Sequence, residues 1–134
     1  MRSLASLAIS SALLLMTPVP AAAETAPPAV EAQFSSFLDK FRAALKADDA
    51  AAVAAMTRLP FMAADNITNV DQFTDMIYEQ DFTGENRACL QTETPVYERD
   101  GANNDNYFIF CGELIFVFTL GPDGFQFTDI GVND

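Results

Sequence analysis

The chain has 134 residues, with 7 Lys and Arg, 19 Asp and Glu and no His, which gives a net charge of −12. Because this charge repels phosphate backbones and anionic membrane surfaces, nucleic acids and membranes are not expected partners. The absence of histidine excludes Ser-His-Asp and Cys-His catalysis and removes a common zinc ligand. The length suits a single domain with one hydrophobic core.

Residues 1–23 have the layout of a secretory signal peptide. Arg2 supplies a positive charge, Leu4–Met16 is an apolar run, and a proline-containing stretch leads to three alanines directly before Glu24. We therefore expect cleavage before Glu24 and a soluble mature protein in the periplasm or outside the cell. A membrane anchor is disfavoured because the apolar run is shorter than the roughly 20 residues of a bilayer span. No cysteine lies near the cleavage site, so a lipid anchor is not expected either.

Residues 24–30, ETAPPAV, are expected to form a flexible lead, and residues 31–134 the single domain. A helix is predicted over residues 31–47, because five apolar residues recur at helical spacing: Phe34, Phe37, Leu38, Phe41 and Leu45.

Two shorter helices are predicted over residues 50–57 and 70–78, separated by a break at Pro60. A polar loop at 79–85, anchored by Phe82, is expected to follow them. Each short helix has candidate N-caps directly before it or in its first turn: Asp48 or Asp49 for the first, and Asn69 or Asp71 for the second.

From Arg87 onwards the apolar residues alternate, which predicts strands. The predicted strands span residues 87–97, 107–120 and 125–132, with a polar turn region at 98–106 and a tight turn at 121–124. In the long strand the even positions are apolar and are expected to face the helices: Phe108, Phe110, Leu114, Phe116, Phe118 and Leu120. The order of elements predicts an α+β fold with the helices packed on one face of a curved antiparallel sheet.

Two cysteines in an exported chain favour one disulfide, between Cys89 and Cys111. If Arg99-Asp100-Gly101 forms a three-residue hairpin loop, these cysteines lie opposite each other on neighbouring strands. A turn at Asn103-Asn104 would instead shift the register and separate them. There is no CxxC spacing, so the expected disulfide is structural and not a redox site.

The loop over residues 98–105 is acidic and offers oxygen ligands of the kind that calcium prefers: Glu98, Asp100, Asn103 and Asp105. It lacks the DxDxDG order and the closing glutamate of an EF-hand loop. We therefore interpret it as a solvated hairpin tip, with Glu98, Asp100 and Asp105 as weak metal candidates. No metal and no other cofactor is expected.

Glu113 and Asp129 are acids inside apolar strands, where burial would raise a carboxyl pKa. The alternation places Glu113 on the mixed face, whereas the face of Asp129 depends on the turn register. Asp129 is therefore the candidate pocket acid, which could act with one of three tyrosines: Tyr78, Tyr97 or Tyr107. The alternative is that both acids face water or pair with an arginine: Arg58, Arg87 or Arg99.

The opening helix FSSFLDKFRAALKADDAAAVAAM, the break RLPF and the ending LIFVFTLGPDGFQFTDIGV resemble small exported bacterial members of the nuclear transport factor 2-like superfamily. The resemblance covers nearly all of the mature chain and rests on pattern, without a catalytic motif. It implies a cone-shaped α+β roll. Enzymes of that superfamily generally use an Asp–His or Tyr–Asp pair in the cone, and no such pair can be matched residue by residue here.

The function expected from these observations is that of an exported, non-catalytic domain that binds a small apolar ligand or a protein partner. The exposed sheet face is a candidate homodimer surface. One rival hypothesis is a small isomerase or lyase that uses Asp129 with a tyrosine in the cone. Another is a calcium-binding protein that uses the 98–105 loop.

Overall fold

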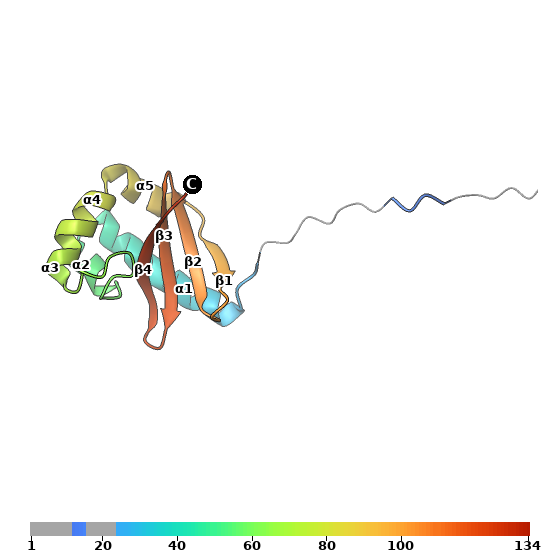
Figure 1. Ribbon diagram of the computed structural model, residues 1–134, viewed down its shortest axis with the longest axis horizontal. Coiled ribbons are helices and arrows are strands. Elements are labelled where there is room, and N and C mark those ends of the chain that lie inside the picture. The colour runs from blue at the N-terminus through green and yellow to red at the C-terminus, as the bar shows by residue number, and fades with distance from the viewer. Residues whose placement is uncertain (1–11, 16–23) are drawn as a thin grey trace, which may run out of the picture.

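The computed structural model describes residues 12–15 and 24–134, and every helix and strand in these ranges lies between Pro28 and Val132. Apart from residues 12–15, the expected signal peptide lies outside the described residues, and so does the residue that precedes its cleavage site. None of the described helices is both long enough and apolar enough to cross a membrane. As predicted, the fold is α+β, with helices against one face of a curved antiparallel sheet (Figure 1).

The first two helices form where the sequence predicts them. Helix α1 spans Pro28–Lys46 and α2 spans Ala50–Ala55. Because proline at the first helical position presets φ, α1 begins three residues earlier than predicted, inside the expected flexible lead. Asp49 is the cap of α2, and its side chain accepts a hydrogen bond from the backbone N–H of Ala52 at 3.0 Å.

The next helical segment runs on without a break from residue 70 to residue 81. It consists of α3 (Val70–Phe73), a π-helical stretch η1 (Thr74–Tyr78) and α4 (Glu79–Asp81). Asn69 caps its start by accepting a hydrogen bond from the N–H of Gln72 at 2.9 Å. The predicted polar loop at 79–85 is therefore wrong at both ends, because residues 79–81 and 84–85 are helical, although Phe82 is buried as expected.

The strand predicted over residues 87–97 is wrong over residues 87–92, because helix α5 occupies Gly84–Thr92, whereas its last two residues, Val96 and Tyr97, do lie in a strand. Thr83 starts this helix by accepting a hydrogen bond from the N–H of Asn86. The residues that follow include Arg, Ala, Leu and Gln, which all favour helix. Two hydrogen bonds fix α5 on α1: Arg42 Nε donates to the carbonyl oxygen of Leu90 at 2.9 Å, and Gln91 Nε2 to that of Arg42 at 2.7 Å.

In the described part of the chain the sheet has four antiparallel strands in the order β1-β2-β3-β4. Their bounds are Val96–Arg99, Asp105–Cys111, Leu114–Gly121 and Gly124–Val132. The tight turn predicted at 121–124 joins β3 to β4. The single long strand predicted over 107–120 is wrong, because the chain reverses at Gly112-Glu113, where Gly112 has a φ of +61°.

This reversal changes which residues face the helices. Cys111 pairs with Leu114, so odd-numbered residues of β2 share a face with even-numbered residues of β3. The inner face of β2 consequently carries Tyr107 and Ile109, which are buried. Phe108 and Phe110 point away from the helices, contrary to the prediction that they line the core.

The space between α1 and the inner face of the sheet is filled by aromatic rings. The phenylalanines that are fully or almost fully buried are Phe41, Phe61, Phe73, Phe116, Phe118 and Phe127. The ring centroid of Phe127 lies 5.3 Å from that of Phe61 and 5.7 Å from that of Phe118. Most phenylalanines of this chain, which has no tryptophan, therefore lie in its hydrophobic core.

Residues 56–58 pair with the free edge of β4. The N–H of Arg58 donates to the carbonyl oxygen of Phe127, and the N–H of Phe127 to that of Met56, each at 2.8 Å. A cis peptide bond joins Leu59 to Pro60 where this segment turns away. Part of the edge is thereby covered, which removes a place where another strand could add.

Candidate functional site

The sheet has an outer face that α1 does not cover, and its side chains form three rows across the strands. In the first row Phe110 of β2 pairs with Ile115, and Ile115 pairs with Gly131. The second row holds Val96, Phe108, Val117 and Asp129, and the third holds Glu98, Asn106, Thr119 and Gln126. We call the side chains of the first two rows, without Asp129, the apolar patch.

The apolar patch is accessible at its centre and at one edge. Phe110 is 42% exposed and Val96 is 47% exposed. Phe108, Ile115 and Val117 are half-buried and, with Glu98 and Gly131, line an open cavity of about 270 Å³. Because Gly131 carries no side chain, the first row leaves a hollow above β4, next to Ile115. Large apolar side chains in contact with each other and with solvent are typical of an interaction site.

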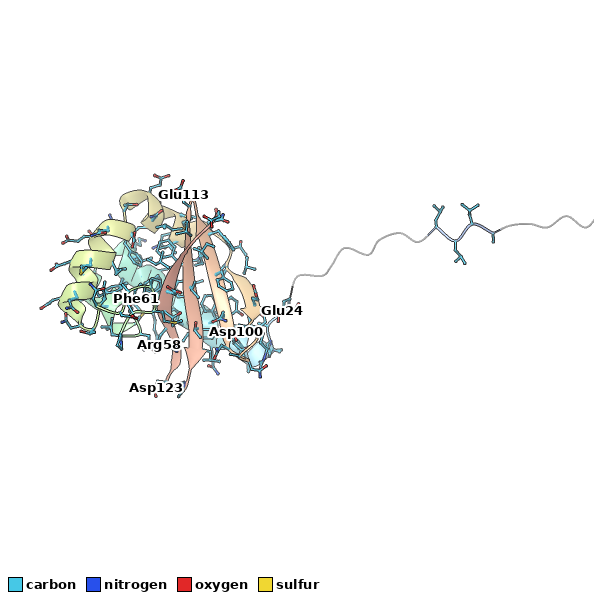
Figure 2. The ribbon with its side chains drawn as sticks, in the orientation of Figure 1. Glu24, Arg58, Phe61, Asp100, Glu113 and Asp123 are labelled. Atoms are coloured by element: carbon cyan, nitrogen blue, oxygen red, sulfur yellow. A yellow bond between two sulfur atoms is a disulfide. The ribbon has the colours of Figure 1, made fainter. Side chains whose placement is uncertain are left out.

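A second cavity, of about 290 Å³, adjoins the patch and shares Phe108 and Val117 with it, and seven of its ten lining residues are polar or charged. It is closed on one side by Arg58 and Met62 and on the other by the β1–β2 turn, and Arg58 and Asp100 are labelled at this end of the sheet in Figure 2. Buried hydroxyl and amide groups at its floor bond to each other. Thr119 Oγ1 donates to Asn106 Oδ1 at 2.7 Å and lies 2.9 Å from the hydroxyl oxygen of Thr128.

Asp129, the acid singled out from the sequence, lines this second cavity and not the interior of the fold. Burial raises its pKa, and a hydrogen bond of 2.8 Å from the N–H of Ile130 to Oδ1 acts in the opposite direction. Arg58 and Asp100 are the charged groups that line the cavity with it. The cavity is open to solvent, so Asp129 does not lie alone in a closed apolar pocket.

The structure does not bring Asp129 together with a tyrosine. The hydroxyl of Tyr78 donates to Asp48 at 2.7 Å, and that of Tyr97 to Asp105 at 2.5 Å. Tyr107 lies on the inner face, where its ring stacks on Phe34. None of these tyrosines lines the cavity of Asp129. The pair of Asp129 with a tyrosine, on which the isomerase or lyase hypothesis depends, is therefore not formed by these residues.

Glu113 lies at the tip of the β2–β3 turn and is exposed, at the opposite end of the sheet from Asp123 (Figure 2). The prediction that it faces one side of a long strand is wrong because the residue belongs to a turn. Its carbonyl oxygen accepts a hydrogen bond from the N–H of Asn133 at 2.8 Å. This backbone hydrogen bond holds the end of the chain against the turn.

Of the three arginines proposed as partners for the two acids, Arg58 lines the cavity of Asp129 without an ion pair to it among the described residues, and the other two bind elsewhere. Arg87 pairs with Asp48 at 2.7 Å, and Arg99 with Asp105 at 3.3 Å. Asp48 also accepts the hydroxyl of Tyr78, so this ion pair connects the α1–α2 turn, η1 and α5. Burial and the hydrogen bond to Asp48 raise the pKa of Tyr78 to about 12, which keeps its hydroxyl a donor at physiological pH.

The acidic loop uses its carboxylates to build its own turn. Asp100 Oδ1 accepts hydrogen bonds from the N–H groups of Ala102 and Asn104, each at 2.9 Å, and Oδ2 accepts from Asn106 Nδ2 at 3.0 Å. Asp105 is held by Tyr97 and Arg99. No group of three or more Asp, Glu, Cys or His that could hold a metal ion occurs among the residues that the structure describes.

These hydrogen bonds predict how Asp100 affects stability at low pH. Hydrogen bonds from Asn104, and then from Asn106, lower its pKa from 3.8 to about 2. The carboxylate therefore stabilises the folded state above the unfolded-state pKa, and this stabilisation is lost as the pH falls from about 4 to about 2. We expect Asp100→Asn to flatten the urea midpoint against pH over that interval. An unchanged slope would contradict the assigned hydrogen bonds.

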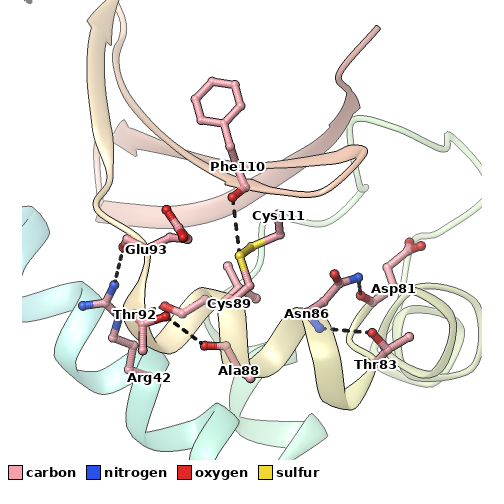
Figure 3. Close-up of a disulfide and its surroundings, with 11 residues drawn as sticks. Arg42, Asp81, Thr83, Asn86, Ala88, Cys89, Thr92, Glu93, Phe110 and Cys111 are labelled. Carbon is pink, nitrogen blue, oxygen red and sulfur yellow. Dashed lines mark hydrogen bonds between the residues drawn. A yellow bond between two sulfur atoms is a disulfide. The ribbon is translucent and has the colours of Figure 1, made fainter.

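The disulfide predicted between Cys89 and Cys111 is present, but in a different setting. It connects α5 to the end of β2 with a Cα–Cα distance of 5.8 Å (Figure 3). Val96 pairs with Phe108 and Arg99 with Asp105, so the loop between the strands is residues 100–104. Neither of the two loops considered from the sequence is correct.

Sequence reasoning missed the polar floor of the second cavity. Its signal was present, because Asn106, Thr119 and Thr128 are polar residues within otherwise apolar strands. The pairing of β2 with β3 places Asn106 opposite Thr119, and a bulge between β3 and β4 at Val117/Phe118 brings Thr128 beside them.

Comparison of the chain with protein-family models, curated proteins and solved structures found no match.

Proposed function

We propose that this chain is an exported, non-catalytic binding domain that holds a protein partner on the outer face of its sheet. The observation that carries the proposal is the apolar patch, in which Phe108 and Phe110 point away from a core that contains nine of the chain's other phenylalanines. Exposing two such rings costs free energy unless a partner covers them. An interior ligand is not favoured, because rings fill the space beneath the sheet.

Charge indicates what kind of partner fits. Glu98 lies at one end of the patch and Asp129 at the other, within a chain of net charge −12. Two copies joined by this face would bring like charges together. We therefore propose a partner with an apolar ridge flanked by Lys or Arg, for which electrostatic attraction speeds association and selects the partner.

Other features are consistent with this function and with an exported location. A disulfide persists in the periplasm or outside the cell and is rare in the cytosol. The signal-peptide pattern of residues 1–23 supports the same location. The α+β architecture agrees with the proposed nuclear transport factor 2-like fold, a fold that hosts many functions and so identifies none of them.

Binding assays with matched variants test the proposal. Phe110→Ser removes the most exposed ring of the patch, and Met76→Ser removes a side chain of similar exposure, 40%, on η1. The mature protein captures binding proteins from its own periplasm at low and at high salt. Each captured protein is then purified, and its affinity for the mature protein is measured separately. We expect one basic partner whose affinity falls at least about tenfold with Phe110→Ser and with added salt, and is unchanged by Met76→Ser.

Sedimentation equilibrium of the purified protein separates this proposal from self-association. A monomer mass for the wild type, together with the purified partner's binding, supports a heterologous partner. A dimer that Phe110→Ser dissociates would identify the same face as a homodimer surface and overturn the basic partner. Equal binding by all three proteins would show that the patch is not an interface.

A further inference from the structure

A third cavity lies where the chain enters the domain, and it meets the apolar patch at Val96. Its volume is about 300 Å³ and it is lined by residues 24–26 and 31, by β1 with the proline before it, and by β2: Glu24, Thr25, Ala26, Glu31, Pro95, Val96, Tyr97 and Tyr107. Ala26 is buried in the core cluster, which fixes the position of the lead beside the cavity. The cavity is therefore built by three segments distant in sequence.

Tyr107 lines this cavity, and its hydroxyl is an unusual group. The residue is only 6% exposed, and its oxygen has no hydrogen-bond partner among the described residues. A buried hydroxyl without a partner costs free energy, so such groups are rare in folded proteins. The ring is fixed by stacking on Phe34 at a centroid distance of 3.8 Å and by contact with Tyr97 at 5.3 Å. The oxygen therefore cannot swing out to water without breaking this packing.

Two acids, Glu31 and Asp105, lie near that oxygen, and Asp105 is paired with Arg99 at 3.3 Å. Burial raises the pKa of Tyr107, and the nearby charges of Glu31 and Asp105 raise it further. Glu24 and Glu31 line the cavity, and none of its lining residues is Lys or Arg. Glu31 forms no ion pair among the described residues. Its position in the first turn of α1 favours the helix, because the helix dipole attracts a negative charge there. The cavity thus combines two acids with no basic residue in its lining, two tyrosine rings, and the hydroxyl oxygen of Tyr107, which receives no hydrogen bond from any residue that the structure describes.

We propose that this cavity binds an ammonium group that donates hydrogen bonds to Tyr107 and Glu31. An ammonium carries several N–H donors and a positive charge, and it interacts favourably with aromatic rings. A calcium ion fits less well, because it needs six to eight oxygen ligands and the described residues hold no cluster of three acids. The apolar wall of Pro95 and Val96 suits an organic amine.

The ammonium has two possible sources. Cleavage before Glu24, as proposed for the signal peptide, would place a new α-amino group on a residue that already lines the cavity. The other source is a small organic amine from the surroundings. Both would satisfy the same hydroxyl and carboxylate, so the experiment must distinguish them.

The test uses protein that begins at Glu24, a range that contains every described helix, strand and core residue as well as the disulfide. It is prepared with a free and with an acetylated amino terminus. The pKa of the α-amino group is measured by NMR, and n-butylammonium chloride is titrated into both forms, with n-butanol as the uncharged control. The variants are Glu31→Gln and Tyr107→Phe, and Asp39→Asn is the control because Asp39 is an exposed acid elsewhere on α1.

If the chain's own amine is the ligand, its pKa is raised by about one unit or more above the ordinary value near 8. Glu31→Gln and Tyr107→Phe then lower that pKa, Asp39→Asn does not, and butylammonium binds only the acetylated form. If an external amine is the ligand, the α-amino pKa is ordinary and butylammonium, but not butanol, shifts the signals of Val96 and Tyr97 in both forms. An ordinary pKa with no saturable shift in either form would overturn the proposal.

Discussion

Replacing Phe127 by alanine is expected to lower the free energy of unfolding by about 3 to 5 kcal/mol, because it opens a cavity among rings that cannot collapse to fill it. Phe127 is fully buried, and its ring lies within 6.3 Å, centroid to centroid, of those of Phe41, Phe73 and Phe82 among others. Urea denaturation followed by circular dichroism measures the change. If the variant is unfolded in water, Phe127→Leu provides a milder substitution of the same kind.

The matched control is Phe110→Ala on the neighbouring part of the sheet. Phe110 is the same residue type, but it points away from the core and is partly exposed. We expect its loss of stability to be below about 1 kcal/mol. Similar losses for the two variants would mean that both rings are buried, and would contradict the assignment of an inner and an outer face.

Removing the disulfide is expected to have the next largest effect. Cys89→Ala combined with Cys111→Ala opens a loop with a sequence separation of 22, which corresponds to about 3 kcal/mol in the chain-entropy account. For a domain of this size we expect the melting temperature to fall by about 10 °C or more. The double substitution avoids leaving a free thiol, and calorimetry measures the change.

Reduction of the wild-type protein is the control for this prediction, because it opens the same loop without changing the sequence. We expect dithiothreitol to lower the melting temperature of the wild type to about that of the double variant, and to leave the variant unchanged. A double variant as stable as the oxidised wild type would show that α5 and β2 are held together without the bond.

The sequence was sufficient to predict the fold class because long segments with a clear period dominate it. The apolar stripe of α1 and the tight turn at 121–124 are local signals, and the structure confirms both. The sequence does not reveal the helix at residues 84–92, because α5 buries a single large apolar side chain, Leu90, so its apolar period is weak. Its cap, Thr83, was the better signal.

The faces of the sheet could not be predicted without the position of the β2–β3 turn. One glycine, Gly112, reverses the chain and thereby exchanges the even and odd faces on one side of the turn. The disulfide was correctly predicted from compartment and cysteine count, which do not depend on register. The register argument for it was wrong, because Cys89 lies on a helix.

The candidate site depends on information that the sequence does not contain locally. The apolar patch exists because the turn at Gly112 places Phe108 and Phe110 on the outer face. Asp129 reaches the same face through its pairing with Val117, next to a bulge. The buried hydroxyl of Tyr107 is apparent only once the lead, α1 and β1 are in place around it.

Photo-crosslinking in the cell tests the proposed interface most directly. The full chain is exported with p-benzoylphenylalanine in place of Phe110, and in a separate strain in place of Met76 as the control position. We predict a discrete crosslink from position 110 to one basic protein and none from position 76. Crosslinks only to a second copy of the chain, or the same products from both positions, would contradict the account.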